Sequence, residues 1–307
     1  MTLQRVIVGV DGSKGAFAAA QWAAAQAEKL GGRLSIVCAY SMASYSAAAL
    51  DGGFALVDDR ALKLGAEQVV SEAAKSVSDY PIDVEEIVQV GDPSVVLTEL
   101  SAEADLLVIS SRGGGGLADR LLGSVSSSVP AHARCAVAMV PEHVSGKPFM
   151  PIERIVVGVD GSDVASSALC TAVDVAIAWG AELTVITAVP IATGGGAMSW
   201  MPVAVDRKAL IEDIHNGLDA AIEQALAGRE LKVARHALDG SPAALLTEFS
   251  TAVDLVVVGT RGRGGFAGML LGSTSNTVLH HSTCPVMTVP SRHRDRRPNP
   301  TTAWDRL

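Results

Sequence analysis

Two glycine-rich loops carry the residues of this sequence whose types and spacing suit chemistry. The second loop holds Gly259 and Gly262, then nine further residues, then Gly272 and Ser273. An apolar, β-branched run precedes Gly259 and predicts a buried strand, while the residues from Ser273 onward offer N-caps for a helix. Glycine lets backbone N–H groups approach an anion, and the first turn of a helix adds unpaired donors and a partial positive charge. The order of strand, loop and helix therefore predicts a phosphate-binding site.

The first half of the chain contains the same loop. Gly113, Gly123 and Ser124 precede their counterparts in the second loop by 149 residues. The segment that ends in Asp11-Gly-Ser is identical at seven of nine positions to the segment that ends in Asp160-Gly-Ser, again at a shift of 149. A constant shift between landmarks predicts that the chain is a tandem duplication without net insertion.

Each copy alternates apolar, strand-like runs with Ala-rich helical segments, in the order β-α-β-α-β-α-β-α-β. This order predicts an α/β fold with two tandem doubly wound domains, each holding a parallel sheet with right-handed crossovers. We expect the domains at residues 1–141 and 152–290. Between them we expect a linker at residues 142–151, punctuated by Gly and Pro, and after them a disordered basic tail at residues 291–307.

Composition and charge narrow the class of protein. Hydrophobic residues make up 49% of the 307 residues, enough for sizeable cores, and the net charge of -9 argues against a general nucleic-acid or anionic-membrane surface. No apolar run approaches the ~18 residues of a membrane-spanning helix. The start of the chain lacks the layout of a signal peptide, and the four cysteines show no CxxC spacing. We therefore expect a cytoplasmic protein with reduced thiols and no membrane partner.

Two familiar phosphate-loop motifs fit the glycine loops poorly. The pattern G-x-G-x-x-A, typical of dinucleotide-binding folds, occurs at Gly113 and Gly262, but it follows the fourth strand instead of the first. It also lacks the acidic residue expected about 20 positions later. A Walker A loop needs G-x-x-x-x-G-K-[ST], and neither loop contains a lysine.

The spacing Gly259-x-x-Gly262, nine residues, Gly272-Ser273 is similar to that of the universal stress protein family, in its ATP-binding subtype. The resemblance extends to Asp160-Gly-Ser after the first strand, to a Gly-Ser-Pro turn after the third and to a closing strand that ends at proline. Because the landmarks occur twice, the chain resembles the tandem two-domain form. The resemblance implies a five-stranded parallel sheet of order 3-2-1-4-5 in each domain, with helices on both faces. It also implies ATP, usually with a divalent metal such as Mg2+, at the carboxyl ends of the strands, where open α/β sheets bind ligands.

The resemblance further implies a role for each matching residue. Glycine-loop N–H groups and the serine hydroxyl would contact phosphates, and an aspartate would lie near the nucleotide and its metal. The backbone at the end of the second strand would read the adenine edge, and a glycine after the third strand would line the base pocket. In the first copy these residues are Gly113, Gly123, Ser124, Asp11, Ala39 and Gly91. In the second copy they are Gly262, Gly272, Ser273, Asp160, Ala188 and Gly240, with Gly259 giving room at the strand end.

Three features leave alternatives open. Ser110 stands where the second copy has Gly259, so its side chain either crowds the ligand or points aside. Arg112 and Arg261 repeat, and they fit either a phosphate contact or a solvated loop position. The glycine runs could instead form only a tight connection, with the aspartates acting as helix caps.

The function favoured by the sequence is a nucleotide-dependent switch in the stress response, with ATP occupancy setting the shape of variable surface loops. One alternative is a slow Mg-dependent ATPase, although no His, Glu or Lys recurs near both loops as a general base. The other alternative is a protein-interaction scaffold that binds no nucleotide. We expect the last strands, 136–140 and 285–289, to join the two domains as an intramolecular pseudo-dimer, because each would otherwise be an exposed edge. A homodimer of whole chains stays open.

Overall fold

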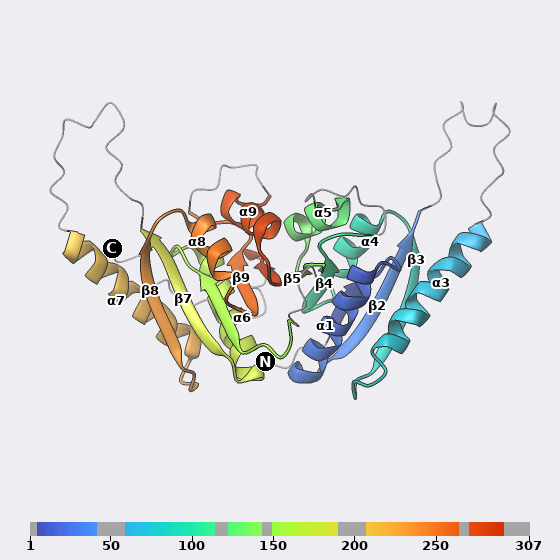
Figure 1. Cartoon of the computed structure of the whole chain (residues 1–307), viewed down its shortest axis with the longest axis horizontal. Helices are drawn as coiled ribbons and strands as arrows, with labels where there is room; N and C mark the ends of the chain where they lie inside the picture. Colours follow the sequence, from blue (N-terminus) through green and yellow to red (C-terminus); the bar gives the residue numbers. More distant parts are fainter. Residues whose placement is uncertain are drawn as a thin grey trace, which may run out of the picture. The chain divides into compact units, whose positions relative to one another are not determined.

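The structure is a computed structural model of the chain, and it describes residues 5–41, 59–113, 122–142, 149–189, 207–263 and 270–291. It divides into two compact units, Met1–Lys147 and Pro148–Leu307 (Figure 1). The predicted tail from residue 292 onward, most of the predicted linker and the middle of each glycine loop lie outside the described residues. Association of the two units through their last strands stays a prediction.

Both units fold as alternating strands and helices. The first unit contains β1 (Arg5–Gly9), α1 (Lys14–Leu30), β2 (Arg33–Tyr40), α3 (Asp59–Ser76), β3 (Val84–Val90), α4 (Pro93–Leu100), β4 (Leu106–Ser110), α5 (Ser124–His132) and β5 (Ala136–Val140). The second unit contains β6 (Arg154–Gly158), α6 (Asp163–Trp179), β7 (Glu182–Val189), α7 (Arg207–Leu226), β8 (Val233–Asp239), α8 (Pro242–Phe249), β9 (Leu255–Gly259), α9 (Ser273–His281) and β10 (Val286–Val289). The predicted α/β fold with two tandem doubly wound domains is confirmed.

Each unit contains a parallel sheet whose strand order reverses beside its first strand. The order is β3-β2-β1-β4-β5 in the first unit and β10-β9-β6-β7-β8 in the second. Val6 of β1 pairs with Leu34 of β2 on one side and with Leu106 of β4 on the other. Because the connections after β1 and β4 leave toward opposite faces of the sheet, a crevice forms between them at the carboxyl edge. When the strands are numbered within each unit, and the second sheet is read from β8 to β10, both sheets have the predicted order 3-2-1-4-5.

Helices cover both faces of each sheet. In the first unit, α1 and α3 pack together on one face, while α4 and α5 contact each other on the other face (Figure 1). The pairs α6 with α7 and α8 with α9 repeat this arrangement in the second unit. The central strands are apolar because both of their faces are covered: Val6, Ile7 and Val8 are 0% exposed. Burial of side chains of this size contributes about 1.5–3 kcal/mol each.

In both units, the helix after the first strand has a serine as its N-cap and a glycine as its C-cap. The Ser13 hydroxyl accepts from the Ala16 N–H, and Gly31 closes α1 with a left-handed φ of 66°. Ser162 and Gly180 do the same for α6. These are favoured helix-capping residues. The alternative in which aspartates cap these helices is wrong, because serines are the N-caps.

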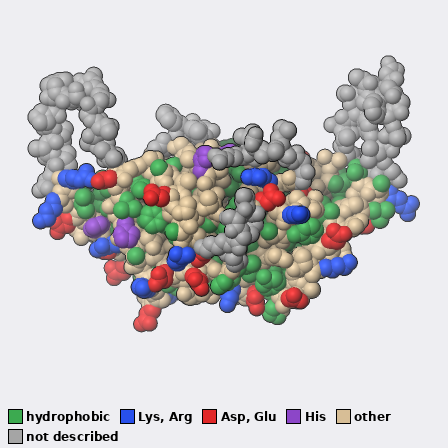
Figure 2. All heavy atoms as spheres, in the orientation of Figure 1, with side chains coloured by type: hydrophobic (Ala, Val, Ile, Leu, Met, Phe, Trp, Pro, Cys, Tyr) green, Lys and Arg blue, Asp and Glu red, His purple; other side chains and the backbone are tan. Residues whose placement is uncertain are grey.

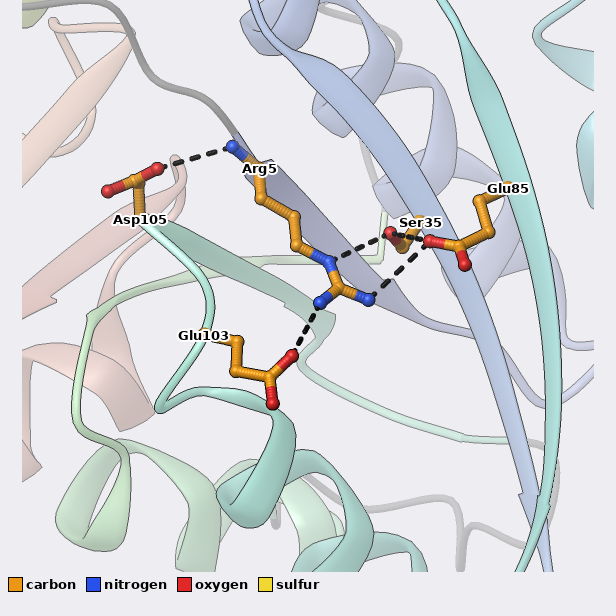
Figure 3. Close-up of polar contacts among 5 residues, drawn as sticks. All are labelled: Arg5, Ser35, Glu85, Glu103 and Asp105. Atoms are coloured by element: carbon orange, nitrogen blue, oxygen red, sulfur yellow. Dashed lines mark hydrogen bonds and ion pairs between the residues drawn. The ribbon is translucent and has the colours of Figure 1, made fainter.

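A polar network around Arg5 joins the amino ends of the strands in the first unit (Figure 3). The Arg5 Nε donates to the Ser35 hydroxyl at 3.2 Å, and its terminal nitrogens reach Glu103 at 2.9 Å and Glu85 at 3.5 Å. Asp105 accepts from the Arg5 backbone N–H at 3.2 Å. The network lies at the opposite edge of the sheet from the crevice, so we expect it to stabilise the fold of the unit and not to contact a ligand.

The lengths of the described helices and the charges on the visible surface concern two predicted absences, a membrane partner and a nucleic-acid partner. None of the described helices is both long and apolar enough to cross a bilayer. On the face shown in Figure 2, acidic and basic side chains intermingle over the described residues, without a continuous basic patch. A nucleic-acid surface would favour clustered Lys and Arg, and the absence of a nucleic-acid partner stays a prediction.

Candidate functional site

A cavity opens at the carboxyl edge of each sheet, in the crevice between its first and fourth strands. Its volume is about 500 Å³ in the first unit and about 440 Å³ in the second, which is typical of small-molecule sites. Of the predicted site residues, those that line the first cavity are Asp11, Ala39, Gly113, Gly123 and Ser124. Those that line the second are Asp160, Ala188, Gly259, Gly262, Gly272 and Ser273. The fold thus brings together residues that are far apart in the sequence.

Gly91 and Gly240 are not among the residues that line the two cavities. Each follows the third strand of its unit with a positive φ, 145° and 141° respectively, a turn conformation that suits glycine. Pro93 and Pro242, two positions later, line the cavities in their place. The two glycines therefore shape the turn that leads to the cavity-lining proline.

An aspartate that follows the first strand is held in the turn before the next helix in both units. In the second unit, Asp160 Oδ1 accepts from the Ser162 N–H at 3.0 Å, and Asp160 Oδ2 accepts from the Arg263 N–H of the glycine loop at 2.8 Å. In the first unit, Asp11 Oδ1 accepts from the Ser13 N–H at 3.0 Å. The Asp160 carboxylate thereby connects the β6–α6 turn to the glycine loop after β9.

The approach of aspartate and loop leaves no space for a side chain on the loop glycine. A Cβ added to Gly113 would lie less than 3.0 Å from Asp11 Oδ2, and a Cβ added to Gly262 would lie equally close to Asp160 Oδ2. Neither glycine has a positive φ, so the constraint here is the nearby carboxylate, which would have to move if the glycine carried a side chain. In the second unit a loop N–H already donates to an anionic oxygen, which is the kind of contact that a phosphate would make.

Both ends of the glycine loop are fixed by hydrogen bonds. The Gly272 N–H donates to the Thr260 carbonyl at 2.7 Å, and the Ser275 hydroxyl donates to the Gly259 carbonyl at 2.6 Å. The Ser126 hydroxyl makes the matching bond in the first unit. The N-cap of α9 is Gly272 and no side chain caps the helix, so the expectation of an N-cap from Ser273 onward is wrong. The first-turn N–H groups therefore remain for a ligand.

Ser110 fits its position because the residue that faces it differs between the units. A Cβ added to Gly15 of α1 would lie less than 3.0 Å from the Ser110 hydroxyl oxygen. The equivalent residues of the second unit are Val164 and Gly259, and a Cβ added to Gly259 would lie 2.8 Å from Val164 Cγ1. The Ser110 hydroxyl also accepts from the Arg112 N–H at 3.4 Å. The Ser110 hydroxyl therefore faces α1 and its own loop, but Ser110 is also among the residues that line the first cavity, so both alternatives for Ser110 stay open.

A leucine forms an apolar wall of each cavity. Leu97 Cδ1 lies 2.7 Å from the position of a Cβ on Gly9, and Leu246 Cδ1 lies 2.9 Å from that of a Cβ on Gly158. Both leucines line their cavities, and neither was predicted from the sequence. The signal that would have indicated them is the repeated glycine inside an apolar strand, which marks the close approach of another group.

Comparison with known proteins identifies the family. The sequence matches the Universal stress protein family over residues 2–141 and 151–290. The chain belongs to the universal stress protein family. It is 32% identical over 294 residues to universal stress protein Rv2005c of Mycobacterium tuberculosis, in an alignment that covers 92% of this chain and 95% of that protein. A second relative from the same organism, universal stress protein Rv2623, is 32% identical over 302 residues, with the same coverage.

A solved structure shows that the fold is shared. The crystal structure of a universal stress protein from Archaeoglobus fulgidus matches with a TM-score of 0.65 at 23% identity, covering 93% of this chain and 96% of that chain. The tandem two-domain form that the sequence indicated is therefore confirmed.

The two sites of this universal stress protein differ in the surroundings of the loop arginine. Arg112 and Arg261 line their cavities at equivalent positions. Arg112 Nη1 lies 3.9 Å from Glu142 Oε2, and the Glu142 N–H donates to the Ser111 hydroxyl at 3.2 Å. Ser291 takes the position of Glu142 in the second unit. Within the described ranges, Arg261 has no ion pair.

The cavities of this family member contain few titratable groups. One aspartate and one arginine are the charged residues in the described lining of each cavity. The described residues contain no group of three or more His, Cys, Asp or Glu that could hold a metal ion. Burial, and to a smaller extent the charge of Asp11, raises the pKa of the Cys38 thiol beside Ala39. Burial and a raised pKa are typical of structural cysteines and not of reactive ones.

Proposed function

We propose that this universal stress protein binds ATP with a divalent cation at the carboxyl edge of each unit, and that ATP occupancy acts as a regulatory switch in the stress response. The observation that carries the proposal is the contact between aspartate and glycine loop. Gly113 lies against Asp11, and Gly262 lies against Asp160, so closely that neither glycine has space for a Cβ. The contact is located where the strand order reverses, which is where doubly wound sheets bind nucleotides. Its repetition supports two sites per chain.

The residues of each site suit different parts of the nucleotide. In the second unit, the N–H groups of Gly262 and Ser273 and the Ser273 hydroxyl would hold phosphate oxygens, because the uncapped start of α9 leaves donors for an anion. Asp160 would contact the cation, and phosphates would supply its other ligands, as they often do for Mg2+. Ala188 and Leu246 would contact the base, since they are apolar residues of the cavity lining.

The described lining favours binding over catalysis. It contains no His, Lys, Glu or Cys that could act as a general base. The carboxylate of Asp160 accepts two backbone N–H groups, which suits a positioning role better than proton transfer. Hydrolysis, if it occurs, would then depend on a water bound to the cation and would be slow.

The first test is to identify the nucleotide that purifies with the full chain. Protein prepared without added nucleotide is denatured, and the released small molecules are identified and counted by mass spectrometry. We expect one ATP for each unit. In Gly262→Ala, the new methyl group meets the Asp160 carboxylate, so this variant should lose the ATP of the second unit and keep that of the first.

Gly65→Ala is the matched control. No heavy atom lies within 4 Å of a Cβ added to Gly65 of α3, so this variant makes the same chemical change away from both sites and should keep both nucleotides. Failure to release any nucleotide, together with no binding when Mg-ATP is added back, would contradict the proposal and favour the scaffold. Steady production of ADP by the wild type, lost in Asp160→Asn, would favour the slow ATPase.

A further inference from the structure

We propose that the two sites differ in phosphate preference. The site of the second unit selects nucleoside triphosphates, whereas the site of the first unit binds adenine nucleotides with little regard to the number of phosphates. The inference rests on the proposed function, because it concerns the same two cavities. Three differences between the units carry it: one is a residue beside the glycine loop, one lies in the helix that follows the loop, and one lies in the loop itself.

The first difference is the charge beside the loop arginine. In the first unit Glu142 lies 3.9 Å from Arg112, with side-chain exposures of 43% and 40%. The pair is screened by solvent and is weak by itself, but it places a carboxylate beside the cation that a phosphate would contact. In the second unit Ser291 replaces that carboxylate, and Arg261 lines the cavity without an ion pair to any described residue. A phosphate at Arg261 would therefore meet a guanidinium whose charge is not offset.

The second difference is the residue after the loop serine. Thr274 lines the second cavity and Val125 lines the first, at equivalent positions in the first turns of α9 and α5. Both side chains are half-buried. A threonine hydroxyl can donate to a phosphate oxygen, whereas valine offers no donor. The second site therefore has one more donor for phosphate in its lining.

The third difference is the charge of the loop sequence, because the second loop carries Arg261 and Arg263, whereas the first carries Arg112 and Arg120 together with Asp119. The N–H of Arg263 donates to Asp160, which places its backbone at the site, while Gly114 is the equivalent residue in the first half of the sequence. The first residues of the helices after the first strands would instead favour an anion at the first site, because α1 begins at the basic Lys14 and α6 begins at the acidic Asp163. Lys14, Asp163 and Arg263 are not among the residues that line the two cavities, whereas Arg261 is, so we give Arg261 the largest weight.

The size of the expected difference in phosphate preference can be estimated from the charges and the hydrogen bond. In solvent-like surroundings, one unit charge about 4 Å from another changes an equilibrium constant by roughly fivefold. A hydrogen bond to a charged group contributes roughly tenfold. The preference of a site for ATP is the dissociation constant of AMP divided by that of ATP. Together the two effects predict that this preference is at least about tenfold larger at the second site than at the first.

The test compares Arg112→Gln with Arg261→Gln in the full chain. Native mass spectrometry follows chains that carry no, one or two nucleotides as ATP or AMP is titrated, which yields a dissociation constant for each site. We expect wild-type protein to bind ATP roughly tenfold more tightly at one site than at the other, and AMP almost equally at both. Arg261→Gln should weaken the tighter ATP site by roughly fivefold or more, while Arg112→Gln changes either site by less than about threefold.

Two further variants assign the difference to its sources. Glu142→Gln should strengthen ATP binding at the weaker site several-fold, because it removes the carboxylate beside Arg112. Thr274→Val should weaken ATP binding at the tighter site and leave AMP binding there nearly unchanged. Equal ATP affinities at the two sites, or an equal effect of both arginine variants, would overturn the inference while ATP binding itself persists. Failure of both sites to bind either nucleotide would instead contradict the proposed function, and the inference with it.

Discussion

The two candidate sites differ in how the space between the helix after the first strand and the end of the fourth strand is filled. In the first unit Gly15 faces Ser110, and in the second unit Val164 faces Gly259. Each pair consists of one glycine and one residue with a side chain, but the side chain comes from the strand in one unit and from the helix in the other. A departure from a motif at one position is therefore interpretable only together with the residue that packs against it.

The strongest challenge to this comparison is to put a side chain on both members of one pair. Gly15→Val would place a Cβ less than 3.0 Å from the Ser110 hydroxyl oxygen in a buried part of α1. We expect the first unit to lose about 2–3 kcal/mol of unfolding free energy, because overpacking forces the helix away from the sheet. Hydrogen exchange of peptides from β1 and β4 reports this unit separately from the second and measures the loss.

Adding Ser110→Gly to Gly15→Val recreates the arrangement of the second unit and should recover most of the lost stability. The coupling between two contacting residues of this kind is about 0.5–3 kcal/mol. Gly65→Val, on the exposed part of α3, controls for the helix propensity of valine. A double variant as unstable as Gly15→Val alone would show that the two residues are not a compensating pair.

A smaller difference between the units lies at the amino ends of the strands. Arg5 has a side chain that is 14% exposed and reaches Glu85 and Glu103, whereas its counterpart Arg154 is exposed. We expect Arg5→Met to lower the unfolding free energy of the first unit by about 1–2 kcal/mol, after discounting the exposed glutamates for solvent screening. Arg154→Met should change the second unit by less than about 0.5 kcal/mol. Hydrogen exchange of β1 and β6 peptides measures both, and equal losses would contradict the difference.

The smallest expected effect is a pH dependence confined to the second unit. The hydrogen bond from Arg235 lowers the pKa of Asp219, while the equivalent positions in the first half of the sequence are Glu86 and Val70. Because the folded-state pKa of Asp219 lies below its unfolded value, its contribution is complete at neutral pH and is lost as the pH falls through the lowered pKa. Asp219→Asn should therefore flatten the acid-induced loss of stability of the second unit below about pH 4. Thermal unfolding across this range is the measurement, and a slope unchanged from wild type would contradict the prediction.

The sequence predicted the arrangement of elements and most of the candidate site. The glycine spacing and the Asp-Gly-Ser turn repeat at a constant shift, and the structure brings Asp160 and Gly262 together as the motif implied. Gly240 was expected to line the candidate site, but Pro242, two positions later, lines the cavity instead. Leu246 was missed because a leucine in an apolar helix has many packing roles, and nothing local distinguishes the one that faces a cavity.

The sequence by itself determined the duplicated α/β order and the position of the glycine loops, because periodicity, turn chemistry and motif spacing act over a few neighbouring residues. Only the tertiary structure decided that Gly15 makes space for Ser110 and that Glu142 lies beside Arg112. These contacts join residues far apart in the chain. They depend on sheet register and on how each helix packs on its sheet, and no local propensity specifies either.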